Sequence, residues 1–393
     1  MTQQKDREQI RSIKNEVKLK ISVITLHNIK NYGSALQAYA TQKKLEQIGV
    51  QVELVDYWRK DVLDKNLLKE CIISSDWNKN FFSRLIYKLI KYPSVHKRIQ
   101  IFNDFLKLYI NLTPVKYISS DELVKNPPIA DIYCTGSDQV WNSYWNRGIE
   151  EPYFLNYIPK GKKCFAYAAS FGKERLTQKE QNIIKPLLQK YSAISMREAS
   201  GVRILKEMGL SSVQILDPTL VLESSEWKKL MAGRTIRRRY LLIYQLNKNY
   251  EFDHHAQQLA RNTGLKLIRL SYDYHHILKT GHLVCCPTVE KWLSLFYYAD
   301  YILTDSFHGT AFSINFNKQF SVFYPPKFSG RLKSILELTG LENRVVTDCR
   351  DFSQFGQRID YDPVNRILAR ERKKADAFLT EALKIQETDG ETE

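Results

Sequence analysis

The chain repeats one local pattern: a short apolar run, then a polar turn, then a helix. In residues 301–318 the run YIL is followed by Thr304, Asp305 and Ser306, and a helix begins near His308. Uninterrupted apolar runs are typical of strands covered on both faces, as in parallel sheets. Because parallel strands are joined by a crossover, usually a helix, the pattern predicts an α/β fold.

Apolar runs of strand length recur along the chain. They occupy residues 21–26, 50–55, 130–135, 163–169, 193–196, 213–216, 240–246, 265–270 and 320–323. The first is followed by a polar loop at 27–34 and a helix at 35–48, which opens a Rossmann-like unit. That loop lacks the GxGxxG spacing, so no dinucleotide fingerprint is predicted.

A length of 393 residues corresponds to two or three domains, since one domain usually has ~100 to 200 residues. We predict a charged extension at 1–20, a Rossmann-like domain at 21–230 with a basic helical insertion at about 60–125, a second Rossmann-like domain at 231–362, and a C-terminal helix and tail at 363–393. Two such domains facing each other across a cleft form the GT-B-like architecture. The last helix is expected to pack back across both.

The net charge of +16, with a pI near 9.3, predicts acidic partners. Candidates are anionic lipid headgroups, phosphorylated or carboxylated small molecules, and nucleic acid. No nucleic-acid module is recognisable, so nucleic acid is not expected. The first 20 residues have no apolar segment of a secretory signal, and no run is long enough to span a membrane, so we expect a cytoplasmic protein.

Histidines and cysteines concentrate in one part of the second half of the chain. They are His254, His255, His275, His276, His282, Cys285 and Cys286. Their spacing matches no closed zinc pattern, and no Asp-x-Asp pattern suited to a metal-nucleotide complex occurs. We therefore predict no metal site and no cofactor.

Residues 81–92, FFSRLIYKLIKY, form a basic amphipathic stripe within the insertion. A stripe of this kind can lie on a membrane surface. The interpretation that we favour is a helix covering the sheet of the first domain, because most such stripes contact a core.

His308 is the leading candidate for an acid or base, because imidazole titrates near neutral pH. It lies where a strand ends and a helix begins, a position that favours ligands and anions. The alternative is a histidine that only bonds a neighbouring loop. Asp305 could orient the imidazole, and a capping role for Asp305 or Ser306 is equally open.

Three further sites carry polar side chains suited to binding. The planar fork of Arg197 suits a carboxylate or phosphate, or else a surface ion pair with Glu198. Asn31 and Gly33 lie in a turn whose amides could receive an anion. Residues 136–142, GSDQVWN, combine hydroxyl, carboxylate, amide and aromatic groups as a sugar site does, and a structural loop would look the same.

Taken together, these segments resemble the polysaccharide pyruvyl transferase family. The matching stretches are NYGSALQAYA at 31–40, GSDQVWN at 136–142, SMREASGVRILKEMG at 195–209, DPTL at 217–220, TDSFHGTAFSINFNK at 304–318 and SGRLKSILELTGLENRV at 329–345. The resemblance implies a GT-B-like fold and transfer of the enolpyruvyl group of phosphoenolpyruvate to a sugar diol. The products would be a cyclic pyruvate ketal and phosphate.

The resemblance also implies roles for individual residues. His308 matches the catalytic histidine of the family, with Asp305 beside it, and Arg197 matches an arginine that holds the donor. Many members carry an arginine where this chain has Ser306, so another cation, Arg331 or Lys327, is expected to bind the donor. The predicted donor site comprises Arg197, Ser306, Gly309, Thr310, Lys327, Ser329 and Arg331. The predicted acceptor site, in the first domain, comprises Asn31, Tyr32, Gly33, Gln37, Ser137, Asp138, Gln139, Trp141 and Asn142.

The expected acceptor is a precursor of a surface polysaccharide, such as a capsule or exopolysaccharide. It could be lipid-linked, with the enzyme in peripheral contact with the anionic inner face of the cytoplasmic membrane. One alternative is a GT-B glycosyltransferase that uses a nucleotide sugar, with Glu290 as the partner of the ribose. Another is a non-catalytic protein that binds glycans or lipids.

Overall fold

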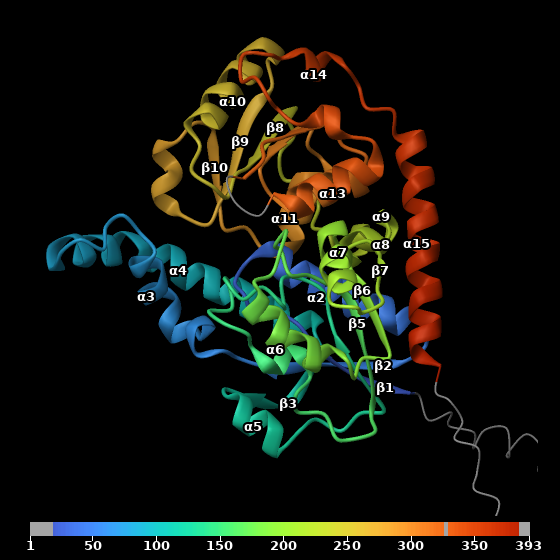
Figure 1. The fold of residues 1–393 in the computed structure, drawn as a ribbon. Coiled ribbons are helices and arrows are strands. Elements are labelled where there is room, and N and C mark those ends of the chain that lie inside the picture. The colour runs from blue at the N-terminus through green and yellow to red at the C-terminus, as the bar shows by residue number, and fades with distance from the viewer. Residues whose placement is uncertain (1–18, 326–328, 385–393) are drawn as a thin grey trace, which may run out of the picture.

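The structure is a computed structural model that describes residues 19–325 and 329–384. The predicted extension therefore lies almost wholly outside the described residues, and so do Lys327 and the last nine residues of the predicted tail, 385–393. The described chain forms two bodies, each built on a parallel sheet (Figure 1). This confirms the predicted α/β class and the pair of Rossmann-like domains.

The first sheet has seven strands in the order β3-β2-β1-β4-β5-β6-β7. The strands are β1 (Lys20–Ile24), β2 (Gln51–Tyr57), β3 (Leu112–Tyr117), β4 (Ile132–Thr135), β5 (Lys163–Ala169), β6 (Ala193–Met196) and β7 (Val213–Gln214). Strand β1 lies at the centre, where Ile21 pairs with Val52 on one side and with Ile132 on the other. Its apolar residues are buried, as expected for a strand with helices on both faces.

The second sheet has five strands in the order β10-β9-β8-β11-β12. They are β8 (Tyr240–Tyr244), β9 (Lys266–Ser271), β10 (His282–Cys285), β11 (Tyr301–Thr304) and β12 (Phe320–Val322). The sequence did not predict β10 or β3, which are the edge strands of their sheets. Both lack a long apolar run, and β3 contains Pro114, which a sheet tolerates at its edge.

Helices cover both faces of each sheet. The α-helices are α2 (Tyr32–Gln47), α3 (Asp64–Ile73), α4 (Phe81–Tyr109), α5 (Ser120–Lys125), α6 (Gln178–Leu188), α7 (Ala199–Glu207), α8 (Pro218–Val221), α9 (Ser224–Leu230), α10 (Tyr250–Thr263), α11 (Val289–Tyr297), α12 (Phe307–Asn315), α13 (Gly330–Thr339), α14 (Ser353–Gly356) and α15 (Tyr361–Leu383). Short 3-10 turns are η1 (Lys60–Val62), η2 (Glu151–Phe154), η3 (Tyr274–Leu278) and η4 (Glu342–Arg344).

The two domains share one apolar core. Tyr32 of α2 stacks on Trp292 of α11 with ring centroids 5.3 Å apart, and its hydroxyl donates to the carbonyl of Pro287 at 2.6 Å. Helix α15 runs along the side of both domains, as predicted (Figure 1). This packing holds the carboxyl ends of the two sheets at a common interface.

The N-terminal half of α4 corrects the interpretation that we favoured for residues 81–92. Together with α3 it projects from the molecule instead of covering the first sheet (Figure 1). Phe82 is 74% exposed and Leu89 is 68% exposed, whereas Phe102 and Phe105, farther along the same helix, are buried in the core. The sequence correctly predicted a helix with apolar residues at helical spacing. No part of the described chain packs over these apolar residues.

Asn315, at the end of α12, joins three helices. Its amide donates to the carbonyls of Thr219 and Leu222 at 2.7 and 2.9 Å, and its carbonyl accepts from Arg372 of α15 at 3.0 Å. All of these bonds cross between segments that are far apart in sequence.

We predict that Asn315→Ala lowers the free energy of unfolding by about 2 kcal/mol, because it leaves buried polar groups without partners. Thermal unfolding should show a lower midpoint. Asn182→Ala, on the exposed face of α6, is the matched control and should leave the midpoint unchanged. Equal midpoints for the two variants would contradict this role of Asn315.

Candidate active site

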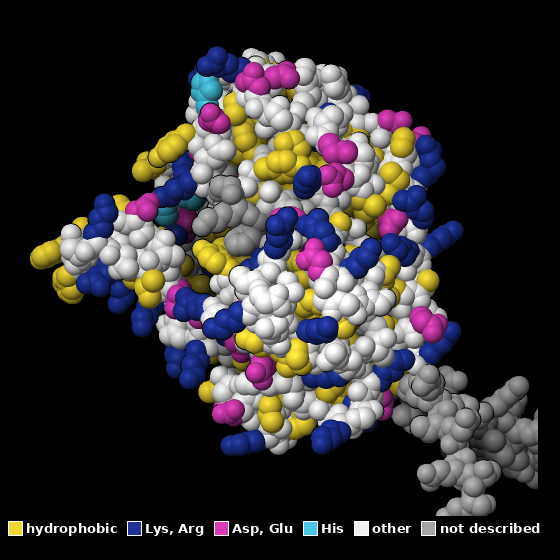
Figure 2. All heavy atoms as spheres, in the orientation of Figure 1, with side chains coloured by type: hydrophobic (Ala, Val, Ile, Leu, Met, Phe, Trp, Pro, Cys, Tyr) yellow, Lys and Arg dark blue, Asp and Glu magenta, His cyan; other side chains and the backbone are white. Residues whose placement is uncertain are grey.

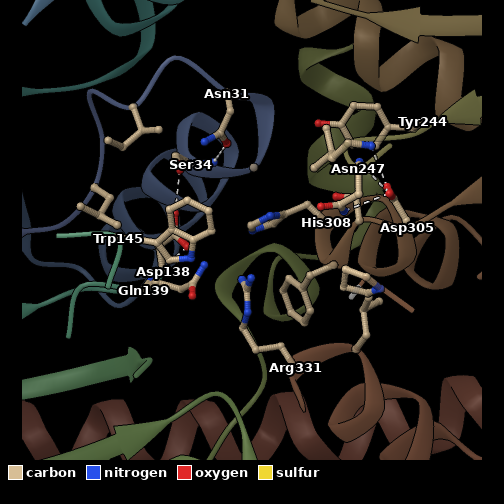
Figure 3. Close-up of a pocket in the computed structure, with 18 of the residues that line it drawn as sticks. Asn31, Ser34, Asp138, Gln139, Trp145, Tyr244, Asn247, Asp305, His308 and Arg331 are labelled. Carbon is tan, nitrogen blue, oxygen red and sulfur yellow. Dashed lines mark hydrogen bonds between the residues drawn. The ribbon is translucent and has the colours of Figure 1, made fainter. Parts of the chain in front are cut away.

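The carboxyl ends of the two sheets border a cavity of about 670 Å³. The first domain lines it with Asn31, Gly33, Ser34, Asp138, Gln139, Tyr144 and Trp145, among others, and the second with Tyr244, Asn247, Asp305, Ser306, Phe307, His308 and Arg331. Figure 3 shows His308 pointing across this space from α12 toward α2. Polar side chains just past strand ends thus meet here, as α/β sheets generally arrange them.

His308 lies in the first turn of α12. The hydroxyl of Ser306 caps this helix by accepting from the amide of Gly309 at 3.3 Å. The imidazole is buried, and its Nε2 has no hydrogen-bond partner among the described residues. A buried ring nitrogen without a partner is costly for stability, so it points to a role with a ligand.

Gly33 makes the close approach of the two domains possible. A Cβ atom at this position would lie 2.1 Å from Nδ1 of His308, far inside van der Waals contact. Only glycine therefore leaves room for the imidazole against the first turn of α2. Asn31 caps the same turn by accepting from the amide of Ser34 at 2.7 Å.

Burial keeps His308 neutral. Burial lowers the pKa of the imidazole from 6.5 to about 4. The positive charges of Arg197 and Arg331 lower this pKa further, whereas the negative charges of Asp217 and Asp138 raise it. At neutral pH the ring therefore has one nitrogen that donates and one that accepts. A neutral imidazole of this kind can accept a proton from a bound hydroxyl.

Arg197 lies behind the cavity, among three carboxylates. Its guanidinium donates to Asp217 at 2.7 Å and to Asp138 at 3.1 Å, and its Nε is 3.8 Å from Glu198. The side chain is fully buried, and Arg197 does not line the cavity. The ion pair considered for Arg197, with Glu198 or another acid, does form, but it lies in the interior and not on the surface. Contact between Arg197 and the donor stays a prediction.

Asp138 does line the cavity. Its carboxylate also accepts from the hydroxyl of Ser34 at 2.6 Å and from the amide of Gln139 at 2.8 Å. Burial acts to raise the pKa of Asp138, but Arg197 and the other nearby cations hold it well below its usual value. Asp138 is therefore ionised beside His308.

Arg331 supplies a cation on the cavity wall. It is the second residue of α13, and its Nε is buried without a hydrogen-bond partner in the part of the chain that the structure describes. Burial and the charge of Arg197 lower its pKa from 12.5 to about 10, so it stays charged at neutral pH. Its guanidinium lies 5.4 Å from the ring centre of Phe307. Arg331 thus lines the cavity, as a donor-binding cation would, and its contact with the donor stays a prediction.

Asp305 does not make the contact that was expected of it. Its two oxygens accept from the amides of Leu246 and Asn247 at 2.7 and 2.8 Å, and from the side chain of Asn247 at 3.0 Å. The carboxylate thereby holds the loop after β8 and forms no hydrogen bond with His308. The prediction that Asp305 orients the imidazole is therefore wrong. Asp305 instead supports the wall of the cavity.

Several predicted site residues lie behind the cavity instead of lining it. They are Tyr32, Gln37, Ser137, Trp141, Asn142, Gly309, Thr310 and Ser329. Trp141 is 1% exposed, and its indole donates to the carbonyl of Tyr153 at 2.9 Å. The carbonyl of Asn142 accepts from the amide of Tyr144 at 3.0 Å. Trp141 and Asn142 thus hold loops beside the site. None of the eight residues lines the cavity, so direct donor contact from Gly309, Thr310 and Ser329, or acceptor contact from the other five, is not supported by the structure.

Three further members of this group make contacts within the protein. Gln37 donates to Thr25 at 3.0 Å, and Ser137 donates to Asp217 at 3.1 Å. Gly309 leaves space for Thr304, because a Cβ there would lie 2.4 Å from its hydroxyl. Glu290, the ribose partner of the nucleotide-sugar alternative, also lies outside the cavity lining.

Sequence reasoning missed several lining residues. They are Arg59, Arg98, Tyr144, Trp145, Tyr244, Leu246, Asn247 and Tyr272, among others. Tyr144 and Trp145 follow the GSDQVWN segment after Ser143, and this pair of adjacent aromatic residues was a signal that could have identified them. Arg98 lies in the middle of α4, 4.2 Å from the ring centre of Tyr272, and only the docking of that helix brings it to the cavity.

One group of side chains in the described ranges has the geometry of a metal site. The ligand atoms of Asp273, His275 and His276 lie within 4.8 Å of one another. Lys91 pairs with Asp273 at 2.6 Å, which places a cation against that carboxylate. None of the three residues lines the His308 cavity.

We predict that the His308 ring titrates near pH 4 in ring-nitrogen NMR spectra. Arg331→Gln should raise this pKa because it removes a cation that opposes protonation, whereas Lys185→Gln on exposed α6 should not change it. Between pH 6.5 and about 4, His308 is protonated in the unfolded chain but neutral in the folded protein. The free energy of unfolding therefore decreases as the pH drops through this range. Titration near 6.5 would contradict the buried neutral ring.

Solved structures match the chain at low sequence identity. A putative UDP-N-acetylglucosamine 2-epimerase from Listeria monocytogenes is 11% identical, with a TM-score of 0.48, and the match covers 92% of this chain and 98% of that one. The heptosyltransferase WaaC from E. coli, with ADP-2-deoxy-2-fluoro heptose, is 8% identical, with a TM-score of 0.40 and coverage of 79% and 90%. No curated protein matches the chain.

The family comparison extends across both domains. The family model for polysaccharide pyruvyl transferases matches residues 31–325, which include Gly33, Asp138, Arg197 and His308. The matched range begins at the cap of α2 and ends just before α13, so it contains most of the cavity. The chain belongs to the polysaccharide pyruvyl transferase family.

Proposed function

We propose that the protein transfers the enolpyruvyl group of phosphoenolpyruvate to a sugar diol of a polysaccharide precursor. The observation that carries this proposal is the pairing, in one cavity, of the neutral imidazole of His308 with the guanidinium of Arg331. Each has a buried nitrogen without a partner, Nε2 and Nε, respectively. The donor offers a carboxylate and a phosphate to a cation, and the acceptor offers a hydroxyl proton to a base.

The reaction needs one proton to leave the sugar and one to reach C3 of the donor. The sugar oxygen adds to C2 in the same step in which C3 gains a proton, so that no free carbanion forms on C3. His308 accepts the proton of the sugar hydroxyl, and the imidazolium passes a proton to C3 within that step. The second hydroxyl displaces phosphate from C2, closes the ketal and gives up its proton to the departing phosphate. Each such proton transfer by a positioned side chain contributes roughly 10² to 10⁴ in rate. No metal is needed for these steps, and the proposal is metal-independent.

Anion binding rests on Arg331 and on the helix ends beside it. A guanidinium suits the planar carboxylate or a phosphate of the donor through paired hydrogen bonds. The first turns of α2 and α13 also border the cavity, and helix N-termini favour negative charge. Arg98 adds a second cation to the wall.

The acceptor side of the cavity suits a carbohydrate. Tyr144 and Trp145 are about half exposed at the cavity wall, and Asn31, Gln139 and Asn247 supply amide groups. Aromatic faces with polar groups around them match the apolar faces and hydroxyls of a sugar. We propose a lipid-linked precursor of a capsule or exopolysaccharide, met by the protein in peripheral contact with the inner face of the cytoplasmic membrane. Within the described ranges, no helix is long and apolar enough to cross a membrane.

We predict that His308→Ala reduces ketal formation by at least about 100-fold, because it removes the proton carrier. Mass spectrometry of the acceptor and release of phosphate measure the reaction. His254→Ala, on an exposed part of α10, is the matched control and should turn over normally. Unchanged turnover in a folded His308→Ala protein would overturn the proposal.

We predict that Arg331→Gln raises the KM for phosphoenolpyruvate by about 10- to 100-fold, since a hydrogen bond to a charged group contributes about 1.5 to 3 kcal/mol. Arg203→Gln, which breaks only an exposed ion pair with Glu174, is the control. Thermal shifts with phosphoenolpyruvate and with nucleotide sugars test the donor class, because a ligand that binds only the folded state raises the midpoint. Protection by a nucleotide sugar alone would favour a glycosyltransferase.

A further inference from the structure

Many of the large exposed apolar side chains among the described residues lie on an arm, defined here as α3 with residues 74–92. The arm projects from the side of the molecule (Figure 1). Figure 2 shows apolar and basic side chains gathered at its tip. Large apolar side chains that are between 41% and 74% exposed are Ile73, Trp77, Phe81, Phe82, Leu85, Ile86, Leu89, Ile90 and Tyr92.

These side chains form a continuous stripe along the first half of α4. Phe81, Leu85 and Leu89 are spaced four residues apart and therefore form one row, and residues 82, 86 and 90 form the row beside it. Scattered apolar residues are ordinary on a protein surface, whereas a contiguous patch marks an interaction site.

The charge of the arm identifies its partner. Within the arm, residues 77–92 contain four lysines or arginines and no aspartate or glutamate, and the whole arm has six basic and three acidic residues. Arg84 and Lys88 are exposed and lie beside the apolar rows on the helix. An anionic lipid surface complements both features, because apolar side chains enter the acyl boundary while long basic chains reach the headgroups. A second copy of this chain would instead bring two positively charged helices together.

The second domain adds to the same surface. In η3, Ile277 is 71% exposed and Leu278 is 92% exposed. This turn packs on α4, since the amide of Tyr274 donates to the hydroxyl of Ser94 at 3.0 Å and Asp273 pairs with Lys91. Apolar side chains from both domains therefore lie next to the arm.

We propose that the arm and η3 dock the protein onto an anionic lipid bilayer. This inference rests on the proposed function in one respect, because the anchor of a lipid-linked acceptor would lie in that bilayer. Helix α4 continues from the tip at Phe82 to Arg98 on the cavity wall. At 1.5 Å per residue, Arg98 lies about 24 Å along the helix from Phe82.

The test uses the full chain with vesicles of phosphatidylcholine alone or mixed with phosphatidylglycerol. The wild-type protein should co-sediment with the anionic vesicles, and less so at high salt. The double variant Phe82→Ser/Leu89→Ser should lose binding by about tenfold or more, because it removes apolar area. Arg84→Glu/Lys88→Glu should lose the preference for anionic lipid. Ile129→Ser, which changes an 86% exposed residue outside the arm, is the matched control.

Absence of wild-type binding, or equal binding by all variants, would overturn docking. So would a wild-type dimer that Phe82→Ser/Leu89→Ser converts to a monomer in analytical ultracentrifugation, because a second copy would then cover the stripe. Turnover of a water-soluble glycan acceptor should be the same in wild type and arm variants. Vesicle binding without any turnover would contradict the proposed function and leave docking intact.

Discussion

The buried charge of Arg197 is the constraint on which the site depends. A guanidinium without water must be matched by nearby carboxylates, and here Asp138, Glu198 and Asp217 surround it. These residues come from the loops after β4, β6 and β7, so the ion cluster ties three strand ends together. Removal of Arg197 would leave these buried carboxylates without the cation that they share.

The same cluster determines the electrostatics of His308. Asp138 and Asp217 favour the protonated ring, whereas burial and the two arginines favour the neutral ring and prevail. Neither domain alone would produce this result, because the imidazole comes from α12 and two of the charges acting on it, Asp138 and Arg197, come from the first domain. The absence of a side chain at Gly33 allows the contact. The contact between Gly33 and His308 therefore belongs both to the packing of the two domains and to the candidate active site.

The sequence predicted those parts of the protein that depend on local pattern. Uninterrupted apolar runs located the central strands, and the strand-turn-helix order located Asp138 and Arg197 at the carboxyl edge of the first sheet and His308 at that of the second. Prediction from the sequence failed where the exposure of a side chain depends on which other segments pack against it. Trp141 and Tyr32 have the composition of a sugar site but are buried as packing residues, whereas residues 81–92 have the period of a covered helix but remain exposed.

By itself the sequence determined the α/β class, the two Rossmann-like halves, the family and the position of the central histidine, because each follows from short-range periodicity and ordered motifs. Only the tertiary structure decided which side chains reach the cavity. Arg331 rather than Arg197 lines it, and Asp305 holds a loop instead of the imidazole. The physical reason is that hydrogen-bond partners and burial depend on segments far apart in the chain, and no local pattern records how those segments pack.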